Sequence, residues 1–101
     1  MNTLQKKATQ AIVQGEIENY LKGFGNIFPD YAKWVVGVTN DLNRRSLEHG
    51  GVTWKQGLMC WNCFDSETAS SVESYFLRLG MNGGTGGVRD NSTLVYVYYS
   101  G

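Results

Sequence analysis

The sequence predicts a small α/β (α+β) domain in which helices flank a three-stranded, mostly antiparallel sheet. Two observations carry this prediction. Segments rich in β-branched and aromatic residues alternate along the chain with segments whose apolar residues recur at helical spacing. The clearest strand candidate, residues 93–99, consists of Val, Tyr, Leu and Thr alone. The expected order of elements is therefore helix, strand, helix, strand, helix, strand.

Composition and charge limit the classes of protein to which this chain can belong. With 42% hydrophobic and 13% aromatic residues, its 101 residues can form a single domain over 1–101 with its own core. A formal net charge of zero argues against strong nonspecific nucleic-acid binding, although a local basic patch can still bind nucleic acid. No segment has the apolar length of a membrane span, so we expect no membrane partner. Two cysteines without a secretory signal indicate a reducing, cytoplasmic setting.

The first element is an amphipathic helix over residues Thr3–Lys22, which we expect to end at Gly23-Phe24-Gly25. Its apolar residues fall near helical spacing: Leu4, Ala8, Ala11, Ile12, Ile17, Tyr20 and Leu21. This N-terminal region, residues 1–25, is expected to pack on a core that spans residues 33–99. A helix that binds a partner or a second copy is the alternative interpretation.

The next stretch is expected to be a buried strand that leads directly into a short helix. Trp34–Val38 is apolar and β-branched, and Thr39-Asn40-Asp41 supplies side-chain oxygens that can cap a helix N-terminus. Leu42 and Leu47 are the apolar positions of this helix, which ends at Gly50-Gly51. An arginine on its first turns lies beside the sheet edge, where it suits an anionic ligand such as a phosphate.

The remaining segments are, in chain order, an irregular or short extended segment, a strand, a helix, a glycine-rich loop and the last strand: 52–56, 57–64, 65–79, 81–90 and 93–99. Asp65 or Ser66 supplies the N-cap of this helix. Its apolar face is formed by Ala69, Val72, Phe76, Leu77 and Leu79.

The stretch from Val35 to His49 resembles the second half-motif of the GIY-YIG nuclease family. In that family an apolar or aromatic pair precedes a glycine and a threonine, and the helix that follows carries a leucine, an arginine and a histidine. The matching residues here are Val35-Val36-Gly37, Thr39, Leu42, Arg45 and His49. The resemblance continues in Glu73 on the later helix and in Asn82 in the loop after it, and it covers roughly residues 33–87.

The sequence departs from the family pattern at both tyrosines of the family name. No strand with a Gly-Ile-Tyr triplet is evident before Trp34, and Val35 stands where the second tyrosine belongs. Either the catalytic tyrosine is lost and the domain no longer cuts, or the C-terminal strand takes the missing strand's place. The second alternative requires that strand to pair antiparallel with the Trp34 strand. Tyr96 and Tyr98, which alternate onto one face, would then be the catalytic tyrosines.

The resemblance implies that Arg45 holds the substrate phosphate and that Glu73 binds Mg²⁺ or Mn²⁺ as cofactor. It also implies a catalytic position for His49, which lies one helical turn after Arg45. The candidate substrate-binding residues are Gly37, Thr39, Arg44 and Asn82. The favoured function is therefore a metal-dependent phosphodiesterase, an endonuclease acting on DNA or RNA, in an active or an impaired form.

Each of these features also has a purely structural explanation. Arg45 and Glu73 can lie in solvent or pair with each other, and His49 can be favoured by the dipole at a helix C-terminus. Cys60 and Cys63 fall on an expected strand, where positions i and i+3 face opposite sides. We therefore expect neither a disulfide nor a shared metal site from this pair.

Two other functions remain open. A non-enzymatic inhibitor or adaptor that binds a protein partner would retain the scaffold without the tyrosines, and the neutral charge favours it. A small-molecule or nucleotide binder would use the glycine-rich segment 80–87, whose backbone N–H groups can approach a phosphate.

Overall fold

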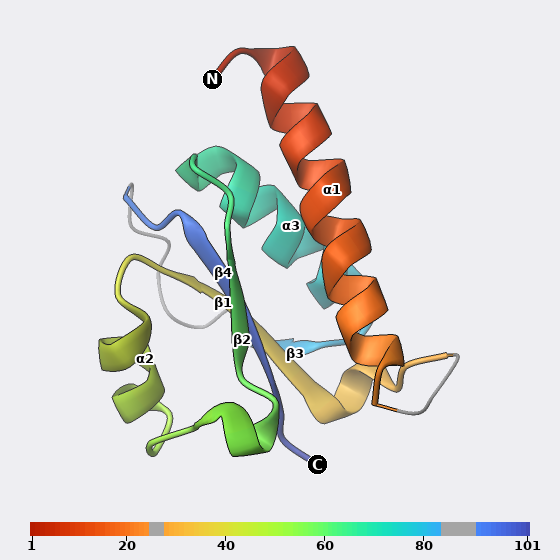
Figure 1. Cartoon of the computed structure of the whole chain (residues 1–101), viewed down its shortest axis with the longest axis vertical. Helices are drawn as coiled ribbons and strands as arrows, with labels where there is room; N and C mark the ends of the chain where they lie inside the picture. The colour runs from red at the N-terminus through yellow and green to blue at the C-terminus, as the bar shows by residue number, and fades with distance from the viewer. Residues whose placement is uncertain (25–27, 84–90) are drawn as a thin grey trace.

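The centre of the fold is β4 (Leu94–Tyr99), the last strand in the sequence, as the computed structural model of the chain shows (Figure 1). It lies between β1 (Trp34–Thr39) and β2 (Met59–Asn62) and pairs antiparallel with both. The structure describes residues 1–24, 28–83 and 91–101. The predicted mixed fold, with a mostly antiparallel sheet flanked by helices, is confirmed.

The predicted number of strands was too low. A fourth strand, β3 (Asn82–Gly83), pairs in parallel with Val35 and Val36 of β1, and the strand order is β2-β4-β1-β3. β3 falls in the segment that the sequence predicts to be a glycine-rich loop. A strand of two residues is too short to show an alternation of polar and apolar side chains, and strand prediction depends on that pattern. Residues 84–90 of that loop lie outside the described residues.

Three α-helices flank the sheet: α1 (Thr3–Lys22), α2 (Leu42–Glu48) and α3 (Ser66–Arg78). Figure 1 shows α1 and α3 on one side of the sheet and α2 on the other. Asn2, Asp41 and Asp65 are their N-caps, and each accepts a hydrogen bond from a backbone N–H of the first turn. No helix in the described ranges is long and apolar enough to cross a membrane.

The irregular segments differ in detail from the prediction. Two 3₁₀ turns, η1 (Tyr31–Lys33) and η2 (Trp54–Gln56), precede β1 and β2, so the segment 52–56 is not a short strand. Thr53 caps η2 through the backbone N–H of Lys55, which explains why the chain turns there. The predicted strand over 57–64 is extended only at the four residues of β2.

The apolar face of α1 was predicted only in part. Its buried residues are Val13, Ile17 and Leu21, which recur every four positions, whereas Leu4 and Ile12 are exposed. The buried stripe packs with residues of α3 and with Trp34 and Val36 of β1 in one apolar core. The helix is therefore a packing layer over the sheet.

The ladder between β1 and β4 decides which side chains share a face. Val36 lies opposite Val97, and both belong to the core beneath α1 and α3. Because side chains alternate along a strand, the neighbouring pairs point to the other face, toward α2. These pairs are Gly37 opposite Tyr96 and Val35 opposite Tyr98. The antiparallel pairing required for a rearranged GIY-YIG arrangement is thus present.

Candidate functional site

The candidate site is built around the turn from β1 into α2. The Thr39 hydroxyl bonds the backbone N–H and C=O of Asp41, at 3.0 Å and 3.1 Å, and so fixes this turn. The Asp41 carboxylate then accepts from the backbone N–H of Arg44 at 3.1 Å and starts the helix. One turn further on, Arg45 and His49 share the helix face that looks onto the sheet.

A chain of hydrogen bonds joins α2 to β4. Arg45 donates from Nε to the Tyr96 hydroxyl at 3.0 Å, and the same hydroxyl lies 3.1 Å from His49 Nε2. The other ring nitrogen of His49, Nδ1, lies 3.0 Å from the Tyr98 hydroxyl. Both tyrosines that alternation places on one strand face therefore contact the same imidazole. Four of the five predicted catalytic residues form one connected network.

Gly37 provides the space for this network. Tyr96 is directly opposite Gly37 in the ladder, and its ring lies across the glycine. A Cβ at residue 37 would overlap the tyrosine hydroxyl and its ring. The glycine of the family-like motif is thus explained by the packing of Tyr96 and needs no contact with a substrate.

The charges around His49 favour a neutral imidazole. Burial lowers the pKa of His49 and the positive charge of Arg45 lowers it further, whereas Glu48 raises it. A neutral imidazole has one donor and one acceptor nitrogen, which matches its two tyrosine neighbours. Burial raises the pKa of Tyr96, and the hydrogen bond from Arg45 opposes that rise. The network is therefore uncharged at its centre, with the guanidinium at one end.

Glu73 approaches this network from α3, on the other side of the sheet. The side chain is buried, with 7% of its surface exposed, and it makes no hydrogen bond or ion pair to a described residue. Burial raises the pKa of its carboxyl, and the charge of Arg45 lowers it; Glu73 in turn raises the pKa of Tyr96. Burial of a charged carboxylate is energetically costly, so a cation at this position would be stabilising.

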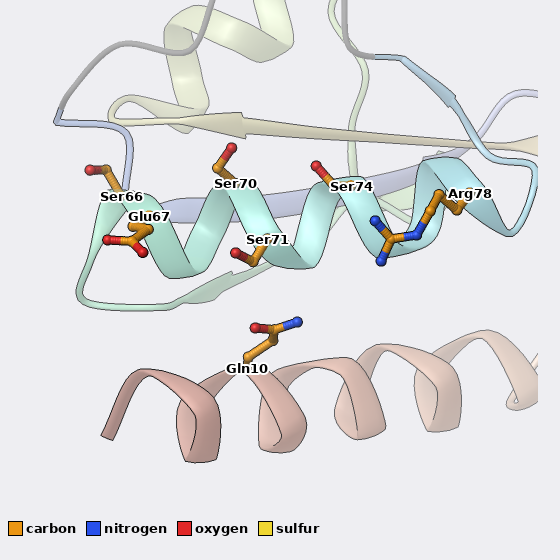
Figure 2. Close-up of a pocket in the computed structure, with 7 residues that line it drawn as sticks. All are labelled: Gln10, Ser66, Glu67, Ser70, Ser71, Ser74 and Arg78. Atoms are coloured by element: carbon orange, nitrogen blue, oxygen red, sulfur yellow. The ribbon is translucent and has the colours of Figure 1, made fainter. Parts of the chain in front are cut away.

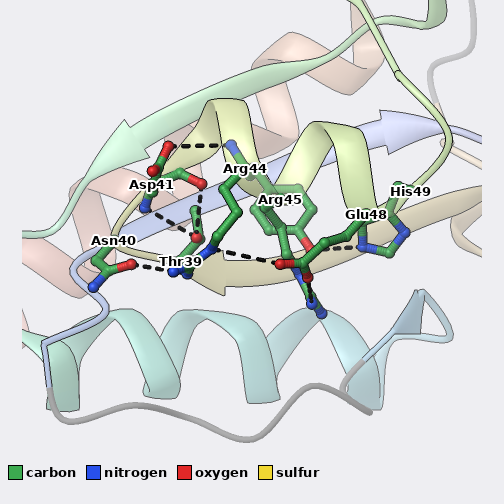
Figure 3. Close-up of polar contacts among 8 residues, drawn as sticks. Thr39, Asn40, Asp41, Arg44, Arg45, Glu48 and His49 are labelled. Atoms are coloured by element: carbon green, nitrogen blue, oxygen red, sulfur yellow. Dashed lines mark hydrogen bonds and ion pairs between the residues drawn. The ribbon is translucent and has the colours of Figure 1, made fainter.

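Glu48 is the residue that sequence reasoning missed. Its carboxylate lies 2.7 Å from Arg45 Nη1 and 3.4 Å from Arg44 Nε (Figure 3). The spacing of three and four residues on one helix was the available signal. Arg45, which was expected to be free for a phosphate or paired with Glu73, is instead paired with Glu48.

The remaining predicted substrate-binding residues have structural bonds of their own. The Thr39 hydroxyl is occupied by the turn, and Arg44 donates to the Asn40 side chain at 3.0 Å. Asn82 lies in β3 rather than in a loop, and its amide donates to the carbonyl of Ala32 at 2.7 Å. None of these three residues is hydrogen-bonded to the Arg45–Tyr96 network.

Glu73, the predicted metal ligand, is a single carboxylate. Among the residues that the structure describes, no group of three or more His, Cys, Asp or Glu side chains is arranged to hold a metal ion. Magnesium, however, is often held by one or two carboxylates, with water and substrate phosphate completing its shell. Cys60 and Cys63 are free thiols, and burial raises the pKa of Cys63 to about 11, so they are poor thiolate ligands.

A polar surface hollow of the described chain lies elsewhere. It measures about 530 Å³ and lies between α1 and α3 (Figure 2). Its lining is polar: Gln10, Ser66, Glu67, Ser70, Ser71, Ser74 and Arg78. By contrast, the space between α2 and the sheet beside Tyr96 holds no cavity of solvent size. Tyr96, with 2% of its surface exposed, is thus closed off by α2.

With this geometry in place, the chain can be compared with known proteins. No protein-family model, curated protein or solved structure matches it.

Proposed function

We propose that this chain is a metal-dependent phosphodiesterase that acts on nucleic acid, with a GIY-YIG-like site whose tyrosines come from the C-terminal strand. The observation that carries the proposal is the connected group Arg45, Tyr96 and His49, with the buried carboxylate of Glu73 close enough to feel the charge of Arg45. The antiparallel pairing of β4 with β1 supports it further, because a rearranged domain needs that pairing.

In this proposal Arg45 binds the phosphate that is cut. A guanidinium can hold two phosphate oxygens at once and stabilise the charge that develops on them. The Glu48 carboxylate, which now occupies one edge of Arg45, is exchanged for the phosphate when substrate binds. The bond from Arg45 Nε to Tyr96 is on a different nitrogen and can persist.

Tyr96 and His49 handle the proton of the attacking water. The step requires a water at the Tyr96 hydroxyl, which α2 covers in the structure, so α2 must move to admit it. The Tyr96 oxygen then takes a proton from the water while its own proton passes to Nε2 of the neutral His49. The water oxygen forms the new bond to phosphorus, and the bond to the leaving oxygen breaks. Nδ1–H of His49 faces Tyr98, whose hydroxyl stabilises the imidazolium that results.

Glu73 is the residue that would hold the metal ion. A divalent ion there would supply a positive charge near the leaving oxygen. Its single protein carboxylate leaves room for water and for substrate oxygens in the coordination shell. The burial of Glu73, which makes no hydrogen bond to a residue that the structure describes, is the feature of this chain that fits such an ion.

The test is cleavage of labelled DNA and RNA, single- and double-stranded, in the presence of Mg²⁺ or Mn²⁺. Arg45→Ala and Glu73→Ala are expected to lower the rate by about 100-fold or more, because each removes a charge that acts on the transition state. Arg44→Ala is the matched control: it deletes an arginine one residue away that bonds Asn40 and Glu48, and it should retain most of the activity. Equal losses in Arg44→Ala and Arg45→Ala, or no cleavage of any substrate by folded protein, would reject the proposal.

A second candidate function is non-enzymatic binding of a protein partner. The observation that favours it is the closure of Tyr96 beneath α2, which leaves no solvent-sized space at its hydroxyl. In that case the Arg45–Tyr96–His49 network anchors α2 to the sheet. Folded protein that cuts no substrate, yet loses stability in Arg45→Ala, would favour this second function.

A further inference from the structure

β2 is an edge strand whose outer side is open. Among residues 1–24, 28–83 and 91–101, β4 is its one neighbour in the sheet, and Figure 1 shows no helix or strand of these ranges over its outer side. Of its four residues, the first and last are exposed. An open strand edge presents unpaired backbone N–H and C=O groups, which form a template for another strand.

The backbone groups that face outward can be identified from the ladder. Cys63 donates its N–H to the carbonyl of Thr93 at 2.8 Å, so this residue points its backbone groups toward β4. Backbone direction alternates along an antiparallel strand, so Met59 and Trp61 also bond to β4. Cys60 and Asn62 therefore direct their N–H and C=O groups to the open edge.

This edge is short, but it carries no charged side chain and no proline of the kind that usually protects a strand edge. Residues 56–64 contain no charged side chain and no proline. Large apolar side chains lie exposed around it instead: Met59 is 44% exposed, Trp54 at its start 77% and Phe64 at its end 72%. The edge therefore combines unsatisfied backbone groups with exposed apolar area.

We propose that β2 pairs antiparallel with β2 of a second copy of this chain and joins the two sheets into one. In the register with the most backbone bonds, Cys60 of each copy exchanges N–H···O=C bonds with Asn62 of the other. Trp61 then lies opposite Trp61 of the second copy, as a non-hydrogen-bonded pair at close approach. Phe64 of each copy comes opposite Leu58 of the other.

A second copy is favoured over an unrelated strand because the edge is self-complementary. Lys55 precedes the uncharged stretch and Asp65 follows it, so antiparallel pairing brings the basic end of one copy to the acidic end of the other. The exposed aromatic residues are also at opposite ends, Trp54 at one and Phe64 at the other. A two-fold axis through Trp61 places the Trp54 end of each copy beside the Phe64 end of the other, so the interface consists of two equivalent halves, as an isologous interface requires. With a net charge of zero, the two copies do not repel each other.

The experiment is sedimentation equilibrium of the full chain from about 1 to about 300 µM, since a dimer is governed by concentration. The wild type should show a monomer–dimer equilibrium. Met59→Lys, which places a charge beside Trp61 of the second copy, should raise the dimer dissociation constant at least about tenfold. Leu4→Lys makes the same charge change on the exposed start of α1 and should leave the constant within about twofold.

Backbone hydrogen exchange keeps the test independent of the variants' folding. In the dimer the amides of Cys60 and Asn62 should become protected as concentration rises, whereas those of Met59 and Trp61 should be protected at all concentrations. A monomer over the whole range, or a dimer in which Cys60 and Asn62 exchange freely, would overturn the proposal. A monomer would leave the edge to a strand from a different protein.

Discussion

Gly37 and Tyr96 lie directly opposite each other in the β1–β4 ladder, and the tyrosine ring fills the space that a side chain at residue 37 would take. This relationship aligns the Tyr96 hydroxyl with Arg45 and His49 on α2. A glycine in the middle of a strand usually weakens it, because it has no side chain to pack. Here the weakness is offset by the aromatic ring that covers it.

The first prediction concerns this glycine. Gly37→Ala should lower the free energy of unfolding by about 2 kcal/mol, because the methyl group forces Tyr96 out of its position. Gly15→Ala is the control, since its Cβ meets no atom within 4 Å on α1 and should stabilise the helix by about 0.5–1 kcal/mol. Urea unfolding measures both. A Gly37→Ala variant as stable as the wild type would show that Tyr96 can lie elsewhere at no cost.

The second prediction separates the two tyrosines of the network. Tyr96→Phe leaves Arg45 Nε and His49 Nε2 without their shared partner in a closed space, so it should cost about 1–3 kcal/mol. Tyr98→Phe removes one bond from a half-buried hydroxyl and should cost less, about 0.5–1.5 kcal/mol. Urea unfolding of both variants gives the order. The reverse order would mean that Tyr98 is the anchor of α2.

The third prediction concerns the protonation of Glu73. Burial raises the pKa of this carboxyl in the folded chain above the unfolded value, so the folded state binds the proton more tightly. The carboxylate therefore opposes folding at neutral pH, and stability should rise as the pH falls through the folded pKa. Glu73→Gln should add about 1 kcal/mol to the free energy of unfolding at neutral pH without metal, because it removes a buried charge.

The metal dependence of this stability gives a second readout. If Glu73 holds Mg²⁺, the ion should raise the melting temperature of the wild type and leave that of Glu73→Gln unchanged. Glu16→Gln, at an exposed position of α1, is the control and should respond to Mg²⁺ as the wild type does. A Mg²⁺ effect that survives in Glu73→Gln would place the ion elsewhere.

The fourth prediction concerns His49, the one histidine of the sequence. Burial and Arg45 lower its pKa in the folded chain, so the unfolded state binds the proton more tightly. The contribution of His49 to the stability of the fold is complete above its unfolded pKa near 6.5, and it is lost as the pH falls toward its folded pKa. Urea unfolding from about pH 5 to about pH 8 should show this slope, and His49→Asn should reduce it.

The neighbours of His49 should shift its titration in opposite directions. Arg45→Gln removes a positive charge and should raise the pKa of His49, whereas Glu48→Gln removes a negative charge and should lower it. Because the chain has a single histidine, its imidazole resonances in an NMR titration need no assignment. Shifts of the same sign in both variants would contradict the charge arrangement described above.

Local signals in the sequence were sufficient for most of the fold. The α1 helix matches its predicted range, Thr3–Lys22, and Asp41 and Asp65 cap the next two helices as their residue types suggest. The prediction that failed concerns a strand that forms only by pairing with residues far away in the sequence. β3 exists because Val35 and Val36 offer it a strand edge, and nothing in its own two residues indicates this.

In the candidate site, too, local features were predictable from the sequence and long-range contacts were not. Alternation along the last strand was enough to place Tyr96 and Tyr98 on one face. That His49 lies between both hydroxyls depends on how α2 is docked against the sheet, which no local pattern encodes. The pairing of Arg45 with Glu48 was visible in the spacing, but only the structure ranks it above a pairing with Glu73.

The central position of β4 also governs how the chain reaches its native state. In the described part of the sheet, β1 and β2 do not pair with each other, and each takes β4 as its antiparallel neighbour. Trp34 pairs with Tyr99, and most of the sequence lies between these two residues. Loop-closure entropy therefore opposes the β1–β4 contacts until a late stage of folding. The helices can form early from local contacts, whereas the sheet must assemble in one non-local step around residues 94–99. That step is therefore expected to set the folding rate. Until it occurs β1 and β2 remain unpaired, so they are the segments exposed to aggregation.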